Sequence, residues 1–488
     1  MKRKVLSAVL CAAMGVSLLA GCGGGSSSSG DTSSADNAAT DDAAGDDAAD
    51  DAGDDAAADD AGEEESTEVE ADAVTTVGPD SGTHMEMWSF VELHNNFYAK
   101  MLEKWNEANP DRQIQITFTT YPFGDMHNKM IMALQTGEGA PDLCDIERGQ
   151  FPNFLQGEPQ LYSLNDALAP YQADLVQSRF DIYAKDGTYY GAPTHVGATV
   201  MYYNTAILDE YGIDYTTIKT WDDYTAAAEQ LKEASNGEVT MTTVDTGGTD
   251  WLWIAMAEYG EDYTDADGKV TVPASWEKML TMQQGWINDG LAVVSPDGQL
   301  DTEGGRQIIM DQKIASFPKA LWYMSRFLSY SNGDLPNMDE PGKWAIAPCP
   351  VFEEGQPRSV GIGGTGTVVT NQSVDPALAA EFIAYAKCSY EGCVGIWEEL
   401  GFDVCNTSVW TDTAITQDTS NQYIAFFKTN PFDVLNEIKN EIGAVTVNSN
   451  VFVLQDYINV NSLNAIMEDG QDVAEALQEA QDAVDLEQ

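Results

Sequence analysis

Basic residues are scarce in this sequence, which has 23 Lys and Arg against 80 Asp and Glu and a formal net charge of −57. A protein that binds nucleic acid needs clustered Lys and Arg to contact the phosphates. An excess of acid on this scale therefore excludes nucleic acid as an expected partner. Beyond that, the charge bears on solubility more than on fold.

Cysteine and histidine are also rare, with 7 Cys and 4 His in the chain. Zinc sites use closely spaced Cys and His, and the sequence has no C-x-x-C, so we expect neither a metal site nor a cofactor. Cys144 and Cys349 lie in apolar, strand-like stretches and are expected to be buried thiols. Whether a disulfide forms among Cys388, Cys393 and Cys405 stays open.

The local patterns of common hydrolases are missing, since the sequence has neither G-x-S-x-G nor H-E-x-x-H. A G-x-G-x-x-G does occur at 361–366. A dinucleotide site would need a helix after it, whereas residues 367–370 are Thr and Val, which favour a strand. We interpret these glycines as a loop. A glycosidase could still use two of the many carboxylates, so that alternative stays open.

The chain begins with a stretch typical of an export signal. Residues 1–4 are basic at three positions, and residues 5–18 are mainly apolar but too few to span a bilayer stably. The tetrapeptide Leu-Ala-Gly-Cys at 19–22 resembles the bacterial lipobox, whose cysteine becomes the lipidated first residue. We expect residues 1–21 to be a lipoprotein signal peptide and Cys22 to anchor the protein on the extracytoplasmic face of the cell membrane.

Residues 22–83 consist almost entirely of small and acidic residues. Nineteen acids, no Lys or Arg and no aromatic residue occur in 23–80. Such a segment buries too little apolar surface to offset the entropy lost on ordering, so we expect a disordered acidic tether. A flexible tether of this length reaches about 40 Å, and repulsion between its charges extends it further.

All 11 Trp, 20 Tyr and 16 Phe lie after residue 84. Alternating apolar residues in 114–118 predict a strand, and the apolar spacing in 97–105 and 250–259 predicts helices. Thr220 is expected to cap a further helix. Strands and helices alternate along the chain, which indicates an α/β fold with parallel strands, and the length suggests two lobes.

Four stretches resemble motifs of the bacterial extracellular solute-binding proteins that bind sugars. They are a G-x-x-P-D-like turn in 135–142, Tyr-Gly-Ala-Pro at 190–193 with Met-Tyr-Tyr-Asn at 201–204, Lys-Thr-Trp-Asp-Asp-Tyr at 219–224, and the strand and glycine loop of 344–350 and 361–370. The resemblance covers nearly all of 84–450. It is closest to the carbohydrate-binding lipoproteins of ABC importers, the maltose-binding-protein-like group.

The resemblance implies a two-lobed periplasmic-binding-protein type II fold (Venus flytrap), with interleaved lobes and crossing hinge strands. The first lobe would contain 84–200 with 345–392, and the second 201–344 with 393–488. Ligand would bind in the cleft between the lobes, because open α/β sheets bind ligands beyond the carboxyl ends of their strands. Closure of the lobes would use a few hinge residues.

The resemblance also implies a monomeric, non-catalytic receptor that captures an oligosaccharide and delivers it to ABC transporter permease subunits in the membrane. The alternative is a cell-surface glycoside hydrolase or a polysaccharide-binding lipoprotein. Aromatic rings stack on the apolar faces of sugars, and polar groups bind the hydroxyls. Residues of these types at predicted strand ends and helix starts form the expected ligand site: Trp88, Glu92, His94, Tyr121, Glu147, Arg148, His195, Asp250, Trp253 and Trp322.

Some members of this set have a competing interpretation. The family's ligand positions correspond best to Trp88, Glu92, Trp253 and Trp322. For Glu147 and Arg148 the correspondence extends only to the loop in which they lie. A tryptophan at a strand end can also turn into the core, and this alternative stays open for Trp88. Glu147 and Arg148 could instead form a surface pair, His94 could be a solvated residue at a helix start, and His195 lies either in the cleft or outside it. The nearby Trp251 competes with Trp253 for the inward face of one helix.

Overall fold

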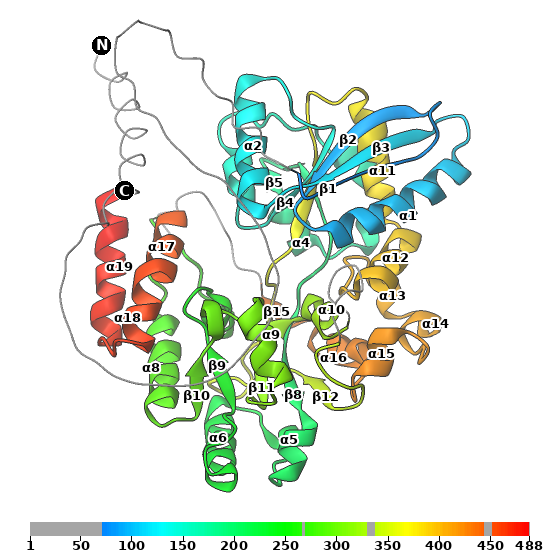
Figure 1. Cartoon of the computed structure of the whole chain (residues 1–488). Coiled ribbons are helices and arrows are strands. Elements are labelled where there is room, and N and C mark those ends of the chain that lie inside the picture. The colour runs from blue at the N-terminus through cyan, green and yellow to red at the C-terminus, as the bar shows by residue number, and fades with distance from the viewer. Residues whose placement is uncertain (1–70, 266–268, 329–336, 444–450, 488) are drawn as a thin grey trace, which may run out of the picture. The chain divides into compact units, whose positions relative to one another are not determined.

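We describe the protein from a computed structural model, which defines residues 71–265, 269–328, 337–443 and 451–487 (Figure 1). The signal segment, Cys22 and most of the expected tether lie outside the described residues. Within the described ranges, every helix is too short or too polar to cross a bilayer.

The first lobe is built on a six-stranded sheet with the order β1-β3-β2-β4-β14-β7 (Figure 1). The three central strands β3, β2 and β4 run parallel, and the other three are antiparallel to their neighbours. The parallel strands therefore end at one edge. The strands are β1 (Ala73–Val77), β2 (Thr83–Ser89), β3 (Ile114–Thr120), β4 (Leu143–Glu147), β7 (Gly191–Pro193) and β14 (Thr365–Val369).

Helices cover both faces of this sheet. Phe97 and Met101 of α1 pack in one apolar cluster with Met87, whereas Met126 of α2 packs with Trp88, which points to the opposite face. Successive strand residues alternate between faces, so one strand serves both layers. The helices of this lobe are α1 (Glu92–Ala108), α2 (Phe123–Thr136), α3 (Asn165–Leu168), α4 (Gln177–Asp181), α11 (Pro376–Cys388) and α12 (Tyr390–Leu400).

Strand β1 corrects the expected extent of the tether, which we placed at 22–83. Its residues pair with β3 in antiparallel register, from Ala73 opposite Thr120 to Val77 opposite Ile116. Its side chains are mostly exposed, so the strand contributes edge hydrogen bonds rather than core. The Thr and Val residues of β1 favour a strand, but the acidic composition around them masked that signal.

The second lobe contains the sheet β11-β8-β12 and the parallel pair β9-β10. Ser316 N donates a hydrogen bond to Met241 O at 2.8 Å, which links the two sheets. We expected β12 in the first lobe, but it pairs with β8 in this one. The strands are β8 (Thr199–Asn204), β9 (Thr242–Val244), β10 (Ala292–Val294), β11 (Ser316–Ala320) and β12 (Trp344–Ala347).

The helices of the second lobe begin where the sequence places their caps. Thr220 accepts the Asp223 N–H and Asp223 accepts the Thr220 N–H, a capping box that starts α6. The helices are α5 (Thr205–Glu210), α6 (Trp221–Ser235), α7 (Asp250–Tyr259), α8 (Ala274–Asn288), α9 (Glu303–Met310), α10 (Met324–Phe327), α17 (Phe452–Tyr457), α18 (Leu463–Met467) and α19 (Val473–Glu487).

The chain returns toward the second lobe later than expected. We placed 393–488 there, but α12 packs against α1 and α11 of the first lobe, whereas the later helix α16 packs against β12. Between α15 and α16, Lys428 N donates to Trp344 O of β12 at 2.8 Å. The remaining elements are α13 (Thr407–Trp410), α14 (Thr413–Thr416), α15 (Gln422–Phe426), α16 (Pro431–Ile438), and the short paired strands β5 (Ala184–Lys185), β6 (Thr188–Tyr189), β13 (Ser359–Val360) and β15 (Ile442–Gly443).

Two segments that cross between the lobes, 194–198 and 361–364, touch through their backbones. Ile362 N donates to Gly197 O at 2.8 Å. Gly197 has φ of 74°, and a Cβ atom there would lie 2.3 Å from Ile362 O. Only glycine combines a left-handed backbone with such a close approach.

The cysteines in the described residues are buried free thiols. The expectation of buried thiols is confirmed for Cys144 and Cys349, and Cys388, Cys393 and Cys405 are likewise free and buried. Burial raises the pKa of Cys393 to about 12. The reactive thiolate form is therefore scarce.

We expect Gly197→Ala to lower the free energy of unfolding by about 2–4 kcal/mol, because the methyl group meets Ile362 O and the backbone is strained. Gly212→Ala is the matched control, since Gly212 has φ of 71° but nothing within 4 Å of its Cβ position. Urea denaturation measures both. Equal losses in the two variants would show that the close approach contributes nothing.

Candidate functional site

Several of the expected site residues lie close after strands, in both lobes. In the first lobe Glu92 begins α1 after β2, and Glu147 ends β4 with Arg148 next. In the second lobe Trp253 lies in α7, and Trp322 lies two residues after the end of β11. Ligands of open α/β sheets bind beyond such carboxyl ends. The junction between the lobes is therefore the candidate site.

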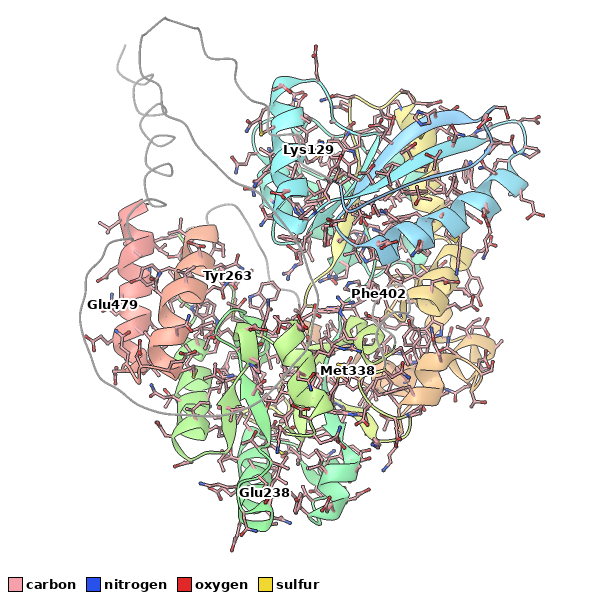
Figure 2. All side chains as sticks on the ribbon, in the orientation of Figure 1. Lys129, Glu238, Tyr263, Met338, Phe402 and Glu479 are labelled. Atoms are coloured by element: carbon pink, nitrogen blue, oxygen red, sulfur yellow. The ribbon has the colours of Figure 1, made fainter. Side chains whose placement is uncertain are left out.

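Arg148 and Trp253 connect the two lobes directly. The guanidinium carbon of Arg148 lies 4.2 Å from the centroid of the Trp253 ring, a cation–π contact. Burial, together with the nearby charge of Arg179, lowers the pKa of Arg148 to about 10, so it stays protonated at neutral pH. Trp253 Nε1 donates to the hydroxyl of Tyr263, to which Gln455 of α17 also donates, at 3.3 Å (Tyr263 is labelled in Figure 2).

Beside this contact, the crossing segments bring several buried polar groups together. Arg179 Nη2 donates to Gly363 O at 2.7 Å. Within the described part of the chain, Arg179 Nε and Nη1, Tyr183 OH and His195 Nδ1 have no hydrogen-bond partner. A Cβ on Gly364 would lie 2.9 Å from Arg179 Nη2, so glycine keeps this space open. Buried polar atoms are normally satisfied, so this group is suited to bind oxygen atoms of a ligand or of water.

His195 is buried beside Asp403 and stays neutral. Its Nδ1 lies 3.9 Å from Asp403 Oδ1. Burial and the nearby charge of Arg179 lower the pKa of His195 well below its ordinary value, so the ring carries one donor and one acceptor. Asp403 Oδ2 accepts the Ala198 N–H at 2.7 Å, which ties this pair to the crossing segment. Phe402, whose ring centroid lies 4.9 Å from that of His195, is labelled between the lobes in Figure 2.

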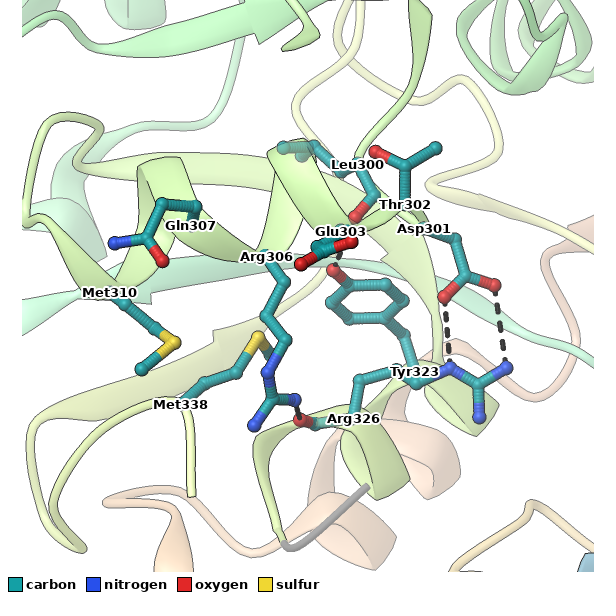
Figure 3. A pocket seen from close by; sticks show the side chains of 10 residues that line it. All are labelled: Leu300, Asp301, Thr302, Glu303, Arg306, Gln307, Met310, Tyr323, Arg326 and Met338. Atoms are coloured by element: carbon teal, nitrogen blue, oxygen red, sulfur yellow. Dashed lines mark hydrogen bonds and ion pairs between the residues drawn. The ribbon is translucent and has the colours of Figure 1, made fainter. Parts of the chain in front are cut away.

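Trp322 is held at the same junction from the second lobe. Its Nε1 donates to Ile362 O at 3.2 Å, and the guanidinium of Arg326 lies 5.5 Å from its ring centroid. Arg326 Nε in turn bonds to Asp301 Oδ1 at 2.9 Å (Figure 3).

A cavity of about 520 Å³, a volume typical of ligand pockets, lies in the second lobe beside Arg326. It is lined by Leu300, Asp301, Thr302, Glu303, Arg306, Gln307, Met310, Tyr323, Arg326 and Met338 (Figure 3).

Trp88 and Tyr121, two of the expected stacking residues, lie in the core of the first lobe. Their rings meet edge to face with centroids 5.4 Å apart. Lys129 of α2, labelled in Figure 2, lies 5.0 Å from the Trp88 ring and 4.6 Å from the Tyr121 ring. Only 4% of Trp88 and 8% of Tyr121 is exposed, which leaves little ring surface for a sugar.

His94 and Asp250, also expected in the site, contact polar partners inside the protein. His94 Nδ1 lies 3.0 Å from Asp145 Oδ2, and Asp145 also accepts the Tyr98 hydroxyl at 2.8 Å, inside the first lobe. Asp250 begins α7 and contacts Lys319 Nζ at 2.5 Å. Both side chains thus have their polar partners within the protein. In the described residues, no group of three or more His, Cys, Asp and Glu could hold a metal ion.

Sequence reasoning missed Arg179, Tyr183, Tyr263 and Arg326. Arg179 belongs to the short helix α4, and Tyr183 follows it, so neither carries a periodic pattern. One usable signal existed: a basic residue beside Phe180 in a chain with so few bases stands out as a buried charge.

Residues 91–387 match the family described as bacterial extracellular solute-binding protein. An arabinooligosaccharide-binding protein of Halalkalibacterium halodurans is 40% identical over 423 residues, which cover 85% of this chain and 92% of the relative. An arabinooligosaccharide-binding protein of Bacillus subtilis is 35% identical over 386 residues, which cover 78% and 87% respectively.

Solved structures share the fold at much lower identity. An ABC substrate-binding protein from Listeria monocytogenes in complex with cycloalternan has a TM-score of 0.67 and 19% identity, covering 83% of this chain and 99% of that one. The sugar-binding protein MalE from Xanthomonas citri has a TM-score of 0.67 and 17% identity, covering 83% and 97%. The likeness confirms the expected two-lobed type II fold.

His127 fixes the backbone at the end of β4 through a neutral ring. Its Nδ1 bonds to Phe123 O at 2.7 Å, and its Nε2 accepts the Glu147 N–H at 3.1 Å. This pair of bonds requires the proton on Nδ1 and none on Nε2. Burial lowers the pKa of His127 from 6.5 to about 4.

The position of this pKa predicts how stability depends on pH. The unfolded chain takes up the proton first as pH falls, so the contribution of His127 is complete above pH 6.5 and is lost between pH 6.5 and 4. The loss amounts to about 3 kcal/mol. His127→Gln should flatten the pH dependence of unfolding free energy over this range, measured with urea at several pH values. His84→Gln, at an exposed histidine, is the control. An unchanged slope in His127→Gln would contradict the assignment.

Proposed function

Because the chain belongs to the bacterial extracellular solute-binding proteins, we propose that it captures an oligosaccharide between its lobes for an ABC importer. The observation that carries the choice of ligand is the 40% identity, over most of both chains, to the Halalkalibacterium halodurans arabinooligosaccharide-binding protein. The 35% identity to the Bacillus subtilis protein of the same name supports it. Arabinooligosaccharides are therefore the proposed ligands.

The chemistry of the junction supports a neutral, hydroxyl-rich ligand. A sugar hydroxyl both donates and accepts hydrogen bonds. The neutral ring of His195 and the hydroxyl of Tyr183 can do the same, and Arg179 adds donors. Trp322 is partly exposed, whereas Arg148 lies over the ring of Trp253. Trp322 is thus the stronger candidate for stacking on a sugar ring.

Binding at this junction would couple ligand capture to lobe closure. A ligand that contacts both lobes stabilises the closed arrangement by the difference in its affinity for the closed and open forms. The contact between Arg148 and Trp253 joins the two lobes, so it would form only on closure. The closed form is then the species that the permease subunits would receive.

Cys22 would carry the lipid anchor, and the acidic segment after it would hold the receptor away from the membrane. The receptor would act as a monomer. The family and the relatives that match are binding proteins, and we propose that this chain likewise turns over no substrate.

We expect the protein to bind arabinooligosaccharides and to gain thermal stability as their concentration rises. Trp322→Ala should weaken binding by about 2 kcal/mol, the scale of a buried aromatic anchor, while Trp322→Phe loses less. Tyr390→Ala, at a tyrosine 42% exposed on α12, is the control and should bind as wild type. Calorimetry measures the affinities. Release of shortened sugars on prolonged incubation would instead identify a hydrolase, and unchanged binding by Trp322→Ala would remove Trp322 from the site.

We expect Cys22→Ala to prevent lipidation and to release the protein from the membrane fraction or leave its signal peptide uncleaved. Cell fractionation followed by mass spectrometry of the N-terminus tests this. Cys11→Ala, within the signal peptide, is the control and should not alter anchoring. A normally processed Cys22→Ala protein that still sediments with membranes would contradict the anchor.

A further inference from the structure

Phe123 is an exposed aromatic residue that neighbouring rings hold in place. It begins α2, and 44% of its surface is exposed. Its ring meets the ring of Phe90 edge to face, with centroids 5.0 Å apart, and lies 4.6 Å from the ring of His127. Phe90 is half-buried and His127 is buried. A single exposed apolar side chain is ordinary, but one braced by two rings has a fixed orientation.

These three rings are continuous with the candidate site. Phe90 directly follows β2, and Phe123 follows β3, so both lie at the edge where β4 delivers Glu147. The hydrogen bond from the Glu147 N–H to His127 Nε2 joins the rings to that strand end. The next residue, Arg148, makes the contact with the second lobe.

Exposure orders the residues of this edge from the floor of the site to its rim. Arg148 is fully buried and His195 is 5% exposed, whereas Phe90 is half-buried and Phe123 is 44% exposed. A ligand bound at the buried end that extends outward along this edge would reach Phe123 last. Only a longer ligand would reach it.

We infer that Phe90 and Phe123 form an outer stacking platform for an additional sugar ring, so that the affinity of the site rises with the length of the oligosaccharide. The inference rests on the proposed function. Phe123 supplies the aromatic face, and Phe90 and His127 fix its orientation, which lowers the entropy lost on binding. If this exposed ring bound a protein partner instead, its contribution to oligosaccharide affinity would not depend on sugar length.

The test measures the affinity of arabinooligosaccharides of increasing length by calorimetry, for wild type and for three variants. Phe123→Ala should weaken binding of the longest ligands about tenfold. For the shortest ligand that binds, its affinity should stay within about twofold of wild type. Phe123→Tyr keeps the ring and should preserve the dependence on length. Met132→Ala, at a residue 65% exposed on the same helix, is the matched control and should match wild type.

Because Phe123 is exposed, we expect thermal unfolding without ligand to show the same stability for the variants and wild type. Equal weakening at every length, or no weakening at any, would overturn the platform while leaving the proposed function intact. A wild-type protein that binds no oligosaccharide would overturn both. Loss of length dependence in Phe123→Ala alone supports the platform.

Discussion

The close approach of two crossing segments is the constraint on which the site depends. Gly197 and Ile362 lie in direct backbone contact, with no room for a side chain between them. This contact aligns the passage from β7 to β8 with the return from β13 to β14. It thereby brings the carboxyl ends of strands from two separate sheets to one junction. The side chains that occupy this junction are therefore positioned by backbone geometry rather than by packing of their own helices.

Charge is distributed unevenly between the surface and this junction. After residue 80 the chain carries 61 acids against 20 bases. Buried Lys319 has Asp250 as its partner, whereas Arg179, also buried, bonds to the backbone oxygen of Gly363. A buried charge that lacks full compensation costs stability. In our proposal a bound ligand relieves that cost, so part of the affinity comes from interactions that folding leaves unmade.

Local signals in the sequence predicted most elements, whereas the site depended on contacts that local signals do not report. The helix at 250–259 and the cap at Thr220 follow from short-range patterns and are confirmed. Arg148 and Trp253 were expected at a strand end and a helix start, but their contact joins residues far apart in the chain. Trp88 also lies at a strand end, yet its ring turns into the core, because alternation along β2 directs it to the face covered by α2.

Burial of the thiols determines how the folded protein responds to oxidants. All five cysteines beyond Cys22 lie in the interior as free thiols, and burial raises their pKa, so the form that reacts with oxidants is suppressed. Packing and hydrogen bonds among the described residues hold the fold without a covalent cross-link. In the folded protein these side chains therefore act as packing groups of the core rather than as redox-active thiols.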